Sequence, residues 1–235
     1  ASCLGVSAEK LRISEETGRK AVELVNKNIK CLDIINEKSV ENAIRVLMAT
    51  GGSTNLIIHL IAIARRANID LTLDDFERIS KETPVLVNVK PHGTENVGMG
   101  FHNAGGVASL MKEMEHMLNG ECLTVSGKTV SENLKEIDMP YDKNTIRPLD
   151  NPIEEKGGIA VLYGNLAPNG AVIKRSAAST RLLKHRGPAK VFENLTECQK
   201  YLLDENSDIT PDTVIVLRGY GPKGAPGMPE NGNFM

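Results

Sequence analysis

Apolar residues recur every three to four positions through much of the first 70 residues, which is the spacing of helices with one buried face. Ser7 can cap a first helix that reaches about Asn28, and a second helix begins near Ser39. The second helix leads into the pair 51–52, two glycines whose backbones can take angles that other residues resist. The run that follows, over 56–64, is apolar nearly all round and predicts a helix inside the protein.

The next part of the chain alternates helix and strand signals. Thr72 begins a short helix with acidic residues in its first turn, and the valine-rich stretch over 85–89 is the first convincing strand. A further helix opens at 101–106 and reaches about Leu118. Together with the earlier helices, this alternation predicts an α/β layered domain over residues 1–118.

The pattern changes near residue 119, where short strand signals separated by Gly, Pro and Asn turns replace the long helices. Strands are expected at 122–125, 158–163, 171–174, 189–192 and 213–217, and short helices at 130–137 and 195–204. Many short strands at this spacing favour a barrel or a sandwich. We expect residues 119–235 to form an incomplete β-barrel-type domain.

The composition excludes several classes of protein. The 235 residues are 25% charged with a net charge of −2 and carry no basic block, so we expect no nucleic-acid partner. The longest apolar run is far too short to span a bilayer, so we expect no membrane partner. The four cysteines are widely scattered, which is typical of reduced thiols. We expect a soluble protein of the cytoplasm, or of an organelle matrix if the source is eukaryotic.

Polar residues that could carry chemistry gather around the predicted buried helix and a nearby turn. The free N–H groups and partial positive charge at the start of that helix favour a carboxylate or a phosphate. Ser53 and Thr54 could bind such an acid or could cap the helix without binding a ligand, and both alternatives stay open. Lys90 and His92 are further candidates, although polar loop residues are usually solvated.

Other side chains are interpreted as structural. His59, inside the apolar helix, is expected to be a core histidine rather than a ligand. Three methionines at helical spacing, Met111, Met114 and Met117, are expected to pack in the core. Asn165 is expected to shape a turn at a strand end.

Seven sequence blocks, in the same order along the chain, resemble those of the dihydroxy-acid/sugar-acid dehydratase family. That family includes dihydroxyacid dehydratase, 6-phosphogluconate dehydratase and the pentonate dehydratases. The blocks are 51–55 with His59, 90–91, 101–106, 124–129, 146–150, 164–168 and 221–230. The chain starts without Met and ends in a glycine-rich stretch, so we expect it to be an internal fragment of such an enzyme.

The resemblance implies a hydro-lyase that converts a 2,3-dihydroxy acid into a 2-keto acid. It implies an iron–sulfur cluster that binds the leaving hydroxyl, Mg²⁺ that holds the substrate carboxylate and 2-hydroxyl, and a serine that removes the C2 proton. Glu230 matches the glutamate that binds Mg²⁺ in the family. The cluster cysteines match segments before Ala1 and the catalytic serine a segment after Met235, so no catalytic residue is assigned and the segment alone is expected to be inactive.

The resemblance also implies an active site between the two domains, with Ser53, Thr54, Lys90 and His92 as candidate substrate ligands. It implies a homodimer or homotetramer. The residues 173–179 and the ending Pro229–Glu230 look more like the pentonate dehydratases than like the enzyme of branched-chain amino-acid biosynthesis. The alternative is a non-catalytic remnant that binds an acid ligand or a partner subunit.

Overall fold

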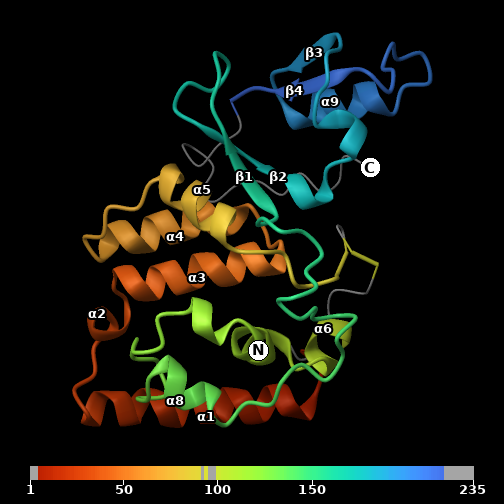
Figure 1. Cartoon of the computed structure of the whole chain (residues 1–235). Helices are drawn as coiled ribbons and strands as arrows, with labels where there is room; N and C mark the ends of the chain where they lie inside the picture. Colours follow the sequence, from red (N-terminus) through yellow and green to blue (C-terminus); the bar gives the residue numbers. More distant parts are fainter. Residues whose placement is uncertain (1–4, 91–92, 95–98, 220–235) are drawn as a thin grey trace. The chain divides into compact units, whose positions relative to one another are not determined.

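The computed structural model describes residues 5–90, 93–94 and 99–219. Contacts between residues divide the chain into two compact units, 1–177 and 178–235. The first unit is mostly helical with one small sheet, and the second unit contains another small sheet (Figure 1). The chain is therefore mixed α/β. None of its described helices is long and apolar enough to cross a membrane.

The helix α1 (Ala8–Asn26) begins where the sequence predicts. The Ser7 hydroxyl accepts a hydrogen bond from the backbone N–H of Lys10 at 3.3 Å and so caps the helix. No residue of α1 is buried, and its apolar side chains Leu11, Val22 and Val25 lie exposed. The single turn α2 (Cys31–Ile34) then leads to the helices of the core.

The main core of the first unit lies where α4 (Asn55–Arg66) and α5 (Leu73–Glu82) pack against α3 (Glu37–Thr50) (Figure 1). The predicted apolar face of α3 is buried here, which confirms that helix. The largest buried side chains of this core are Ile44 and Met48 from α3, Phe76 and Ile79 from α5, and Ile159 from the first sheet.

The prediction that α4 is buried on all sides is wrong for the described residues. Its buried residues are Ile57, Leu60 and Ala64, which lie on one face of the helix. Leu56 and Ile63 are exposed, and so is His59, which is not a core histidine. The sequence misleads here because the helix is apolar on both faces, while the described part of the chain covers only one of them.

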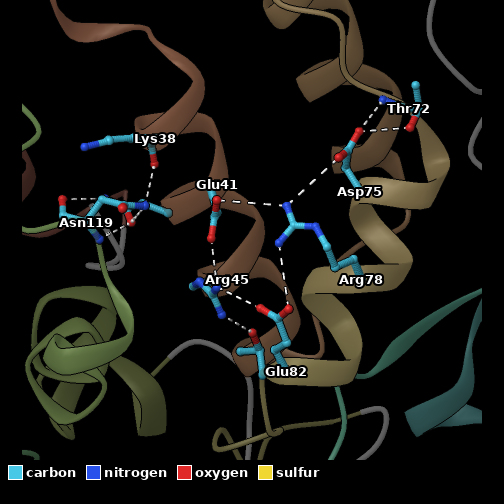
Figure 2. Close-up of polar contacts among 10 residues, drawn as sticks. Lys38, Glu41, Arg45, Thr72, Asp75, Arg78, Glu82 and Asn119 are labelled. Atoms are coloured by element: carbon cyan, nitrogen blue, oxygen red, sulfur yellow. Dashed lines mark hydrogen bonds and ion pairs between the residues drawn. The ribbon is translucent and has the colours of Figure 1, made fainter.

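A network of ion pairs fixes α5 on α3 (Figure 2). Nη2 of Arg45 lies 2.8 Å from Oε1 of Glu41 and 2.9 Å from Oε2 of Glu82. Arg78 approaches Glu41, Asp75 and Glu82 at 3.8 to 4.0 Å. The Arg45 side chain is 12% exposed, so its pairs are less screened by water than those of the half-exposed Arg78. This network joins α3 to α5, and none of its charged side chains is part of the apolar core.

A second core forms around the extended segment 85–89. This segment is buried as a strand would be, but its pairing consists of isolated bridges, Val85 with Glu154 and Val87 with Ile146. The predicted helix over 101–118 is broken into α6 (Met99–Asn103), α7 (Gly106–Glu113) and a short 3₁₀ turn (Glu115–Met117). It breaks because Gly105 and Gly106 adopt φ values of 108° and 63°.

Side chains from these helices fill the space around the segment. Met114 is fully buried, and Met111 and Met117 pack against the cores as partly buried side chains, so the predicted packing role of the methionines is confirmed. The helix α8 (Val130–Leu134) adds Val130 and Leu134 to a small third cluster. The predicted strand at 122–125 is reduced to one bridge, from Leu123 to Thr129.

The sheet of the first unit is a hairpin. Its strands β1 (Ile159–Leu162) and β2 (Ala171–Lys174) are antiparallel, with Ile159 opposite Lys174 at the base. Asn165 lies in the exposed turn between them, as predicted. The short 3₁₀ turn 175–177 follows β2 directly. The hairpin is held on α5, because the buried hydroxyl of Ser80 donates a 2.6 Å hydrogen bond to the Ile159 carbonyl.

The second unit contains η3 (Thr180–Leu182), β3 (Ala189–Phe192), α9 (Leu195–Leu202) and β4 (Val214–Leu217). The two strands are parallel and are joined through α9. The strands predicted at 158–163, 171–174, 189–192 and 213–217 are therefore all confirmed. The described strands form two separate two-stranded sheets and no closed barrel, so the barrel-type domain and the boundary at 118/119 stay predictions.

Candidate functional site

A cavity of about 510 Å³ lies in the first unit at the turn between α3 and α4. It is lined by the turn 50–54, by Val87 and Val89 with the adjoining Lys90, and by Phe101 and Lys174. Four segments of the chain thus meet at one place. Backbone hydrogen bonds join the end of α3 to the segment before Lys90 and to Gly158, and the Gly158 carbonyl accepts a hydrogen bond from Ser176, two residues after Lys174.

The turn is shaped by its glycines. Gly51 ends α3 in the left-handed region, with φ 55°, and the Gly52 N–H donates to the Leu47 carbonyl at 3.1 Å. A Cβ on Gly52 would lie 2.8 Å from Cδ1 of Leu47, which leaves little room for a larger residue. The left-handed backbone favours glycine at position 51, whereas a larger residue at position 52 would require the Leu47 side chain to move.

The serine and threonine of the turn have different roles at the start of α4. The Ser53 hydroxyl accepts a hydrogen bond from the Asn55 N–H at 3.2 Å, and the Ser53 carbonyl accepts one from Leu56. The Thr54 side chain makes no capping hydrogen bond, so the capping alternative holds for Ser53 and not for Thr54. Both residues line the cavity.

Lys90 reaches the cavity because the buried segment before it is anchored beneath the turn. The N–H groups of Leu86 and Val87 both donate to the carbonyl of Ala49, at 2.8 and 3.2 Å. Lys90 is the exposed residue at the end of this segment. The last turn of α3 thus fixes how far Lys90 lies from the Gly51–Gly52 turn.

Lys174 is the second cation of the cavity, and sequence reasoning did not assign it to the site. It is the last residue of β2 and is partly buried. Burial lowers the pKa of its ammonium group from the usual value, because removal of water disfavours the charged form. Within the described residues its ammonium has no hydrogen-bond or ion-pair partner. The available signal was a lysine that directly follows the apolar residues 171–173.

These features give the cavity a positive character. Among the described residues that line it, none is acidic, while Lys90 and Lys174 each carry an ammonium group. The start of the twelve-residue helix α4 adds a partial positive charge on the same side. An ammonium that is partly desolvated and has no protein partner gains most from an anionic ligand, so the arrangement is suited to a carboxylate or a phosphate.

The structure brings together three of the predicted substrate ligands, Ser53, Thr54 and Lys90. Their role as ligands stays a prediction. The other two predicted site residues, His92 and Glu230, lie outside the described residues. Nε2 of His102, a residue of the sequence block 101–106, lies 3.2 Å from Oε2 of Glu9 on α1.

The described residues do not fit a cluster or a metal ion. Nowhere in the described part of the chain do three His, Cys, Asp or Glu side chains gather as a metal site would require. Cys31 is exposed, and Cys122 and Cys198 are buried in different units. Burial raises the pKa of both buried thiols, whereas a cluster ligand must lose its proton.

Comparison with known proteins covers nearly the whole chain. Residues 1–133 match the N-terminal domain, and residues 144–235 the C-terminal domain, of the dihydroxy-acid/6-phosphogluconate dehydratases. The chain is 46% identical to a dihydroxy-acid dehydratase of Prochlorococcus marinus, over 94% of its length and 40% of the relative. It is 45% identical to a dihydroxy-acid dehydratase of Sulfurisphaera tokodaii, over 98% of its length and 41% of the relative.

A third relative has a less specific name. The chain is 43% identical to a putative dehydratase, IlvD1, of Rhizobium meliloti, over 97% of its length and 40% of the relative. The chain thus spans about two fifths of the length of these curated relatives.

Proposed function

Because the chain belongs to the dihydroxy-acid/6-phosphogluconate dehydratase family, we propose that the protein is a hydro-lyase acting on a 2,3-dihydroxy acid. The reaction removes the 3-hydroxyl and the C2 proton as water, and the resulting enol becomes a 2-keto acid. The observation that carries the proposal for this chain is the cavity at the Gly51–Gly52 turn, which is lined by two lysines and, among the described residues, by no acid.

In this proposal, Lys90 and Lys174 bind the carboxylate that every substrate of the class carries. The Ser53 hydroxyl and the start of α4 lie on the same cavity and add polar contacts. An ionised carboxylate has two oxygens and about four acceptor positions, so it can accept hydrogen bonds from ammonium groups and still coordinate a cation. The role of this chain is therefore to bind and orient the acid.

We further propose that the complete enzyme uses an iron–sulfur cluster and Mg²⁺, with Glu230 as a ligand to Mg²⁺. The support is membership of the family, and the cluster ligands are assigned to parts of the protein outside these 235 residues. The cluster supplies Lewis-acid chemistry when bound. We expect Glu230→Gln to lower the bound Mg²⁺ measured by elemental analysis of the complete protein, and an unchanged Mg²⁺ content would exclude this ligand.

The experiment that tests the function is a panel assay of the complete protein. Dihydroxy acids of the branched-chain pathway, pentonates and 6-phosphogluconate are supplied in turn, and release of the 2-keto acid is measured. Activity on one of them confirms the dehydratase and identifies its branch of the family. A metal-loaded enzyme that dehydrates none of them overturns the proposal and favours a non-catalytic protein that binds an acid.

Lys174→Met tests the cavity in the same assay. Loss of a charge-assisted contact to the carboxylate is expected to raise KM about 10- to 100-fold. Lys156→Met is the matched control, because this exposed lysine lies near the hairpin but does not line the cavity. A KM that is unchanged in Lys174→Met would remove this lysine from the site.

We also propose that the protein is a homodimer or a homotetramer that works in the cytoplasm, or in an organelle matrix in a eukaryote. The scattered cysteines of the sequence support a reducing compartment. Light scattering of the complete protein during size-exclusion chromatography measures the oligomeric state.

A further inference from the structure

We propose that Arg175 is a positioning residue for anion binding: it holds the segment 154–158, and through that segment it fixes Lys174 beside the Gly51–Gly52 turn. The inference rests on the proposed function only in taking the anion to be the carboxylate of a dihydroxy acid. Arg175 is adjacent to Lys174 in sequence but is not among the residues that line the cavity.

Arg175 holds its segment through one nitrogen with three acceptors. Its Nη2 donates to Oε2 of Glu154 at 2.9 Å, to the carbonyl of Lys156 at 3.0 Å and to the carbonyl of Gly157 at 3.3 Å. The acceptors span four residues of one loop, so a single side chain fixes the course of that loop. A lysine could carry the charge but not the planar donor geometry of the guanidinium.

The same loop is tied to the segment that carries Lys90. The carbonyl of Glu154 accepts a hydrogen bond from the Val85 N–H at 2.9 Å, and the Ile153 N–H donates to the Val85 carbonyl at 2.8 Å. Glu154 therefore binds Arg175 with its side chain and the Val85 segment with its backbone. Both lysine-bearing segments take their position from residues 153–158.

The far end of the loop meets the glycine turn. The Gly158 carbonyl accepts a hydrogen bond from the Ser176 N–H at 3.2 Å, and the Gly158 N–H donates to the Met48 carbonyl at 3.4 Å. A Cβ on Gly158 would lie 2.7 Å from Cα of Gly51, so the two backbones are in close contact. A shift of the loop would therefore be transmitted to the turn and to the base of β2, where Lys174 lies.

The Arg175–Glu154 ion pair is expected to affect the position of Lys174 more than the stability of the fold. The side chains of Arg175 and Glu154 are 31% and 33% exposed, and ion pairs with this much water contact contribute little to stability. The position of Lys174 is more sensitive, because an ammonium must lie within hydrogen-bond distance of its anion to contribute. Loss of the Arg175 contacts is thus expected to weaken anion binding more than folding.

The test is a double-mutant cycle on the complete protein, with binding of glycerate, the smallest 2,3-dihydroxy acid, measured by calorimetry. Arg175→Lys is expected to raise the Kd of glycerate about tenfold, with Tm close to that of the wild type. In the Lys174→Met background, Arg175→Lys is expected to have a much smaller effect, because most of its action passes through Lys174 and only the remainder through the segment that carries Lys90. Glu154→Gln is expected to behave as Arg175→Lys does.

The pH dependence of Kd gives a second readout that a purely structural role would not change. Burial lowers the pKa of the Lys174 ammonium, and Lys90 is the other titratable side chain among the described lining residues. If Arg175→Lys releases Lys174 into water, the alkaline pKa seen in glycerate binding moves up towards the ordinary lysine value. Arg78→Lys, an ion-paired arginine between α3 and α5, is the control and is expected to leave both readouts unchanged.

Three outcomes would overturn the inference: an unchanged Kd in Arg175→Lys, an equal loss in the presence and absence of Lys174, or a loss that accompanies general unfolding in both Arg175→Lys and Arg78→Lys. Because glycerate binding is measured without turnover, these results are independent of the panel assay. A protein that binds glycerate through this pair but dehydrates no acid would retain the inference and lose the proposed function.

Discussion

At the scale of single residues, Gly51 and Gly158 show how a side chain as small as a hydrogen atom can determine a site. Their backbones touch beneath the cavity, and a Cβ on Gly158 would also lie 2.7 Å from Oγ of Ser176. Contact with backbone atoms cannot be relieved by rotating a flexible side chain. The close contact therefore depends on glycine at position 158.

We expect Gly158→Ala to destabilise the protein by about 1–3 kcal/mol, because the added methyl group overpacks a backbone contact. Gly18→Ala is the matched control. Gly18 lies inside the exposed helix α1 with nothing within 4 Å of a new Cβ, so alanine there is expected to stabilise by about 1 kcal/mol. Thermal unfolding measures both variants. Equal effects of the two substitutions would contradict the close packing at Gly158.

From the lowered pKa of Lys174 we predict how affinity for the acid and protein stability change with pH. The ammonium loses its proton at a lower pH than an ordinary lysine, so affinity for the acid is expected to fall as the pH rises through that lowered value. In the absence of ligand, the relevant pH window lies between the lowered pKa of Lys174 in the folded protein and its ordinary pKa in the unfolded chain. In this window the unfolded chain binds more protons than the folded protein, so the free energy of unfolding is expected to rise with pH. Lys174→Arg keeps the charge and should abolish the early loss of affinity, measured as KM against pH.

The residues of the site were predictable where their chemistry is local. Ser53 follows a glycine pair and precedes an apolar run, so its place at a helix start can be read from the sequence. The apolar residues before Lys174 mark it as a strand end but do not place it at the cavity, because that place depends on the contact between Gly158 and Gly51, which are 107 positions apart. Local patterns do not contain contacts of that kind.

At the scale of elements, the start of α3 is closed by a reciprocal pair of hydrogen bonds, a capping box. The Asn36 side chain accepts a hydrogen bond from the Ser39 N–H at 3.0 Å, and the Asn36 N–H donates to the Ser39 hydroxyl at 2.9 Å. This reciprocal pair satisfies two backbone N–H groups, one of them at the start of the helix. It matters for the site because the other end of α3 is the Gly51–Gly52 turn.

We expect Asn36→Ala to destabilise the protein by about 1 kcal/mol, the usual cost of losing an N-cap. Asn36→Asp keeps an acceptor and adds a charge that the helix start favours, so it should be near neutral. Denaturant unfolding measures both variants. If alanine and aspartate destabilise equally, loss of the cap is not the cause.

Helices and strands with a clear boundary signal were predicted well, and those decided by distant contacts were not. Ser7 and the acidic first turn after Thr72 mark helix starts that the structure confirms. The helix over 101–118 was predicted as continuous, although Gly105 and Gly106 break it by adopting positive φ values. The exposed face of α4 was missed because hydrophobicity alone does not tell which face another element covers.

At the scale of the whole chain, the two compact units are expected to respond separately to core mutations. Phe192 is 3% exposed and lies in β3 of the second unit, where its ring packs at 5.6 Å from that of Tyr201. The sequence analysis predicts a domain boundary at 118/119 from a change in local pattern, and it contains no signal for the division between the compact units at 177/178. Strand β1 packs against α5 and β2 pairs with β1, and the local sequence pattern does not reveal these distant contacts.

We expect Phe192→Ala to destabilise the second unit by about 3–5 kcal/mol, because it leaves a cavity in a small core. Amide hydrogen exchange in the complete protein is expected to show loss of protection in 189–217 with protection in α3 and α5 unchanged. A fall of protection in both units together would show that they unfold cooperatively. Glu205→Ala, a change at an exposed turn residue of the same unit, serves as the control.

The hairpin has a consequence for engineering. Lys174 lies at its base, opposite Ile159, while the tip with the exposed Leu166 lies at the other end. Residues inserted between Asn165 and Leu166 would extend the tip outward and leave the register at the base unaltered, because exposed tips accommodate added chain. The tip is therefore a suitable attachment point for a peptide tag or a fluorescent dye that reports on the protein without disturbing the cavity.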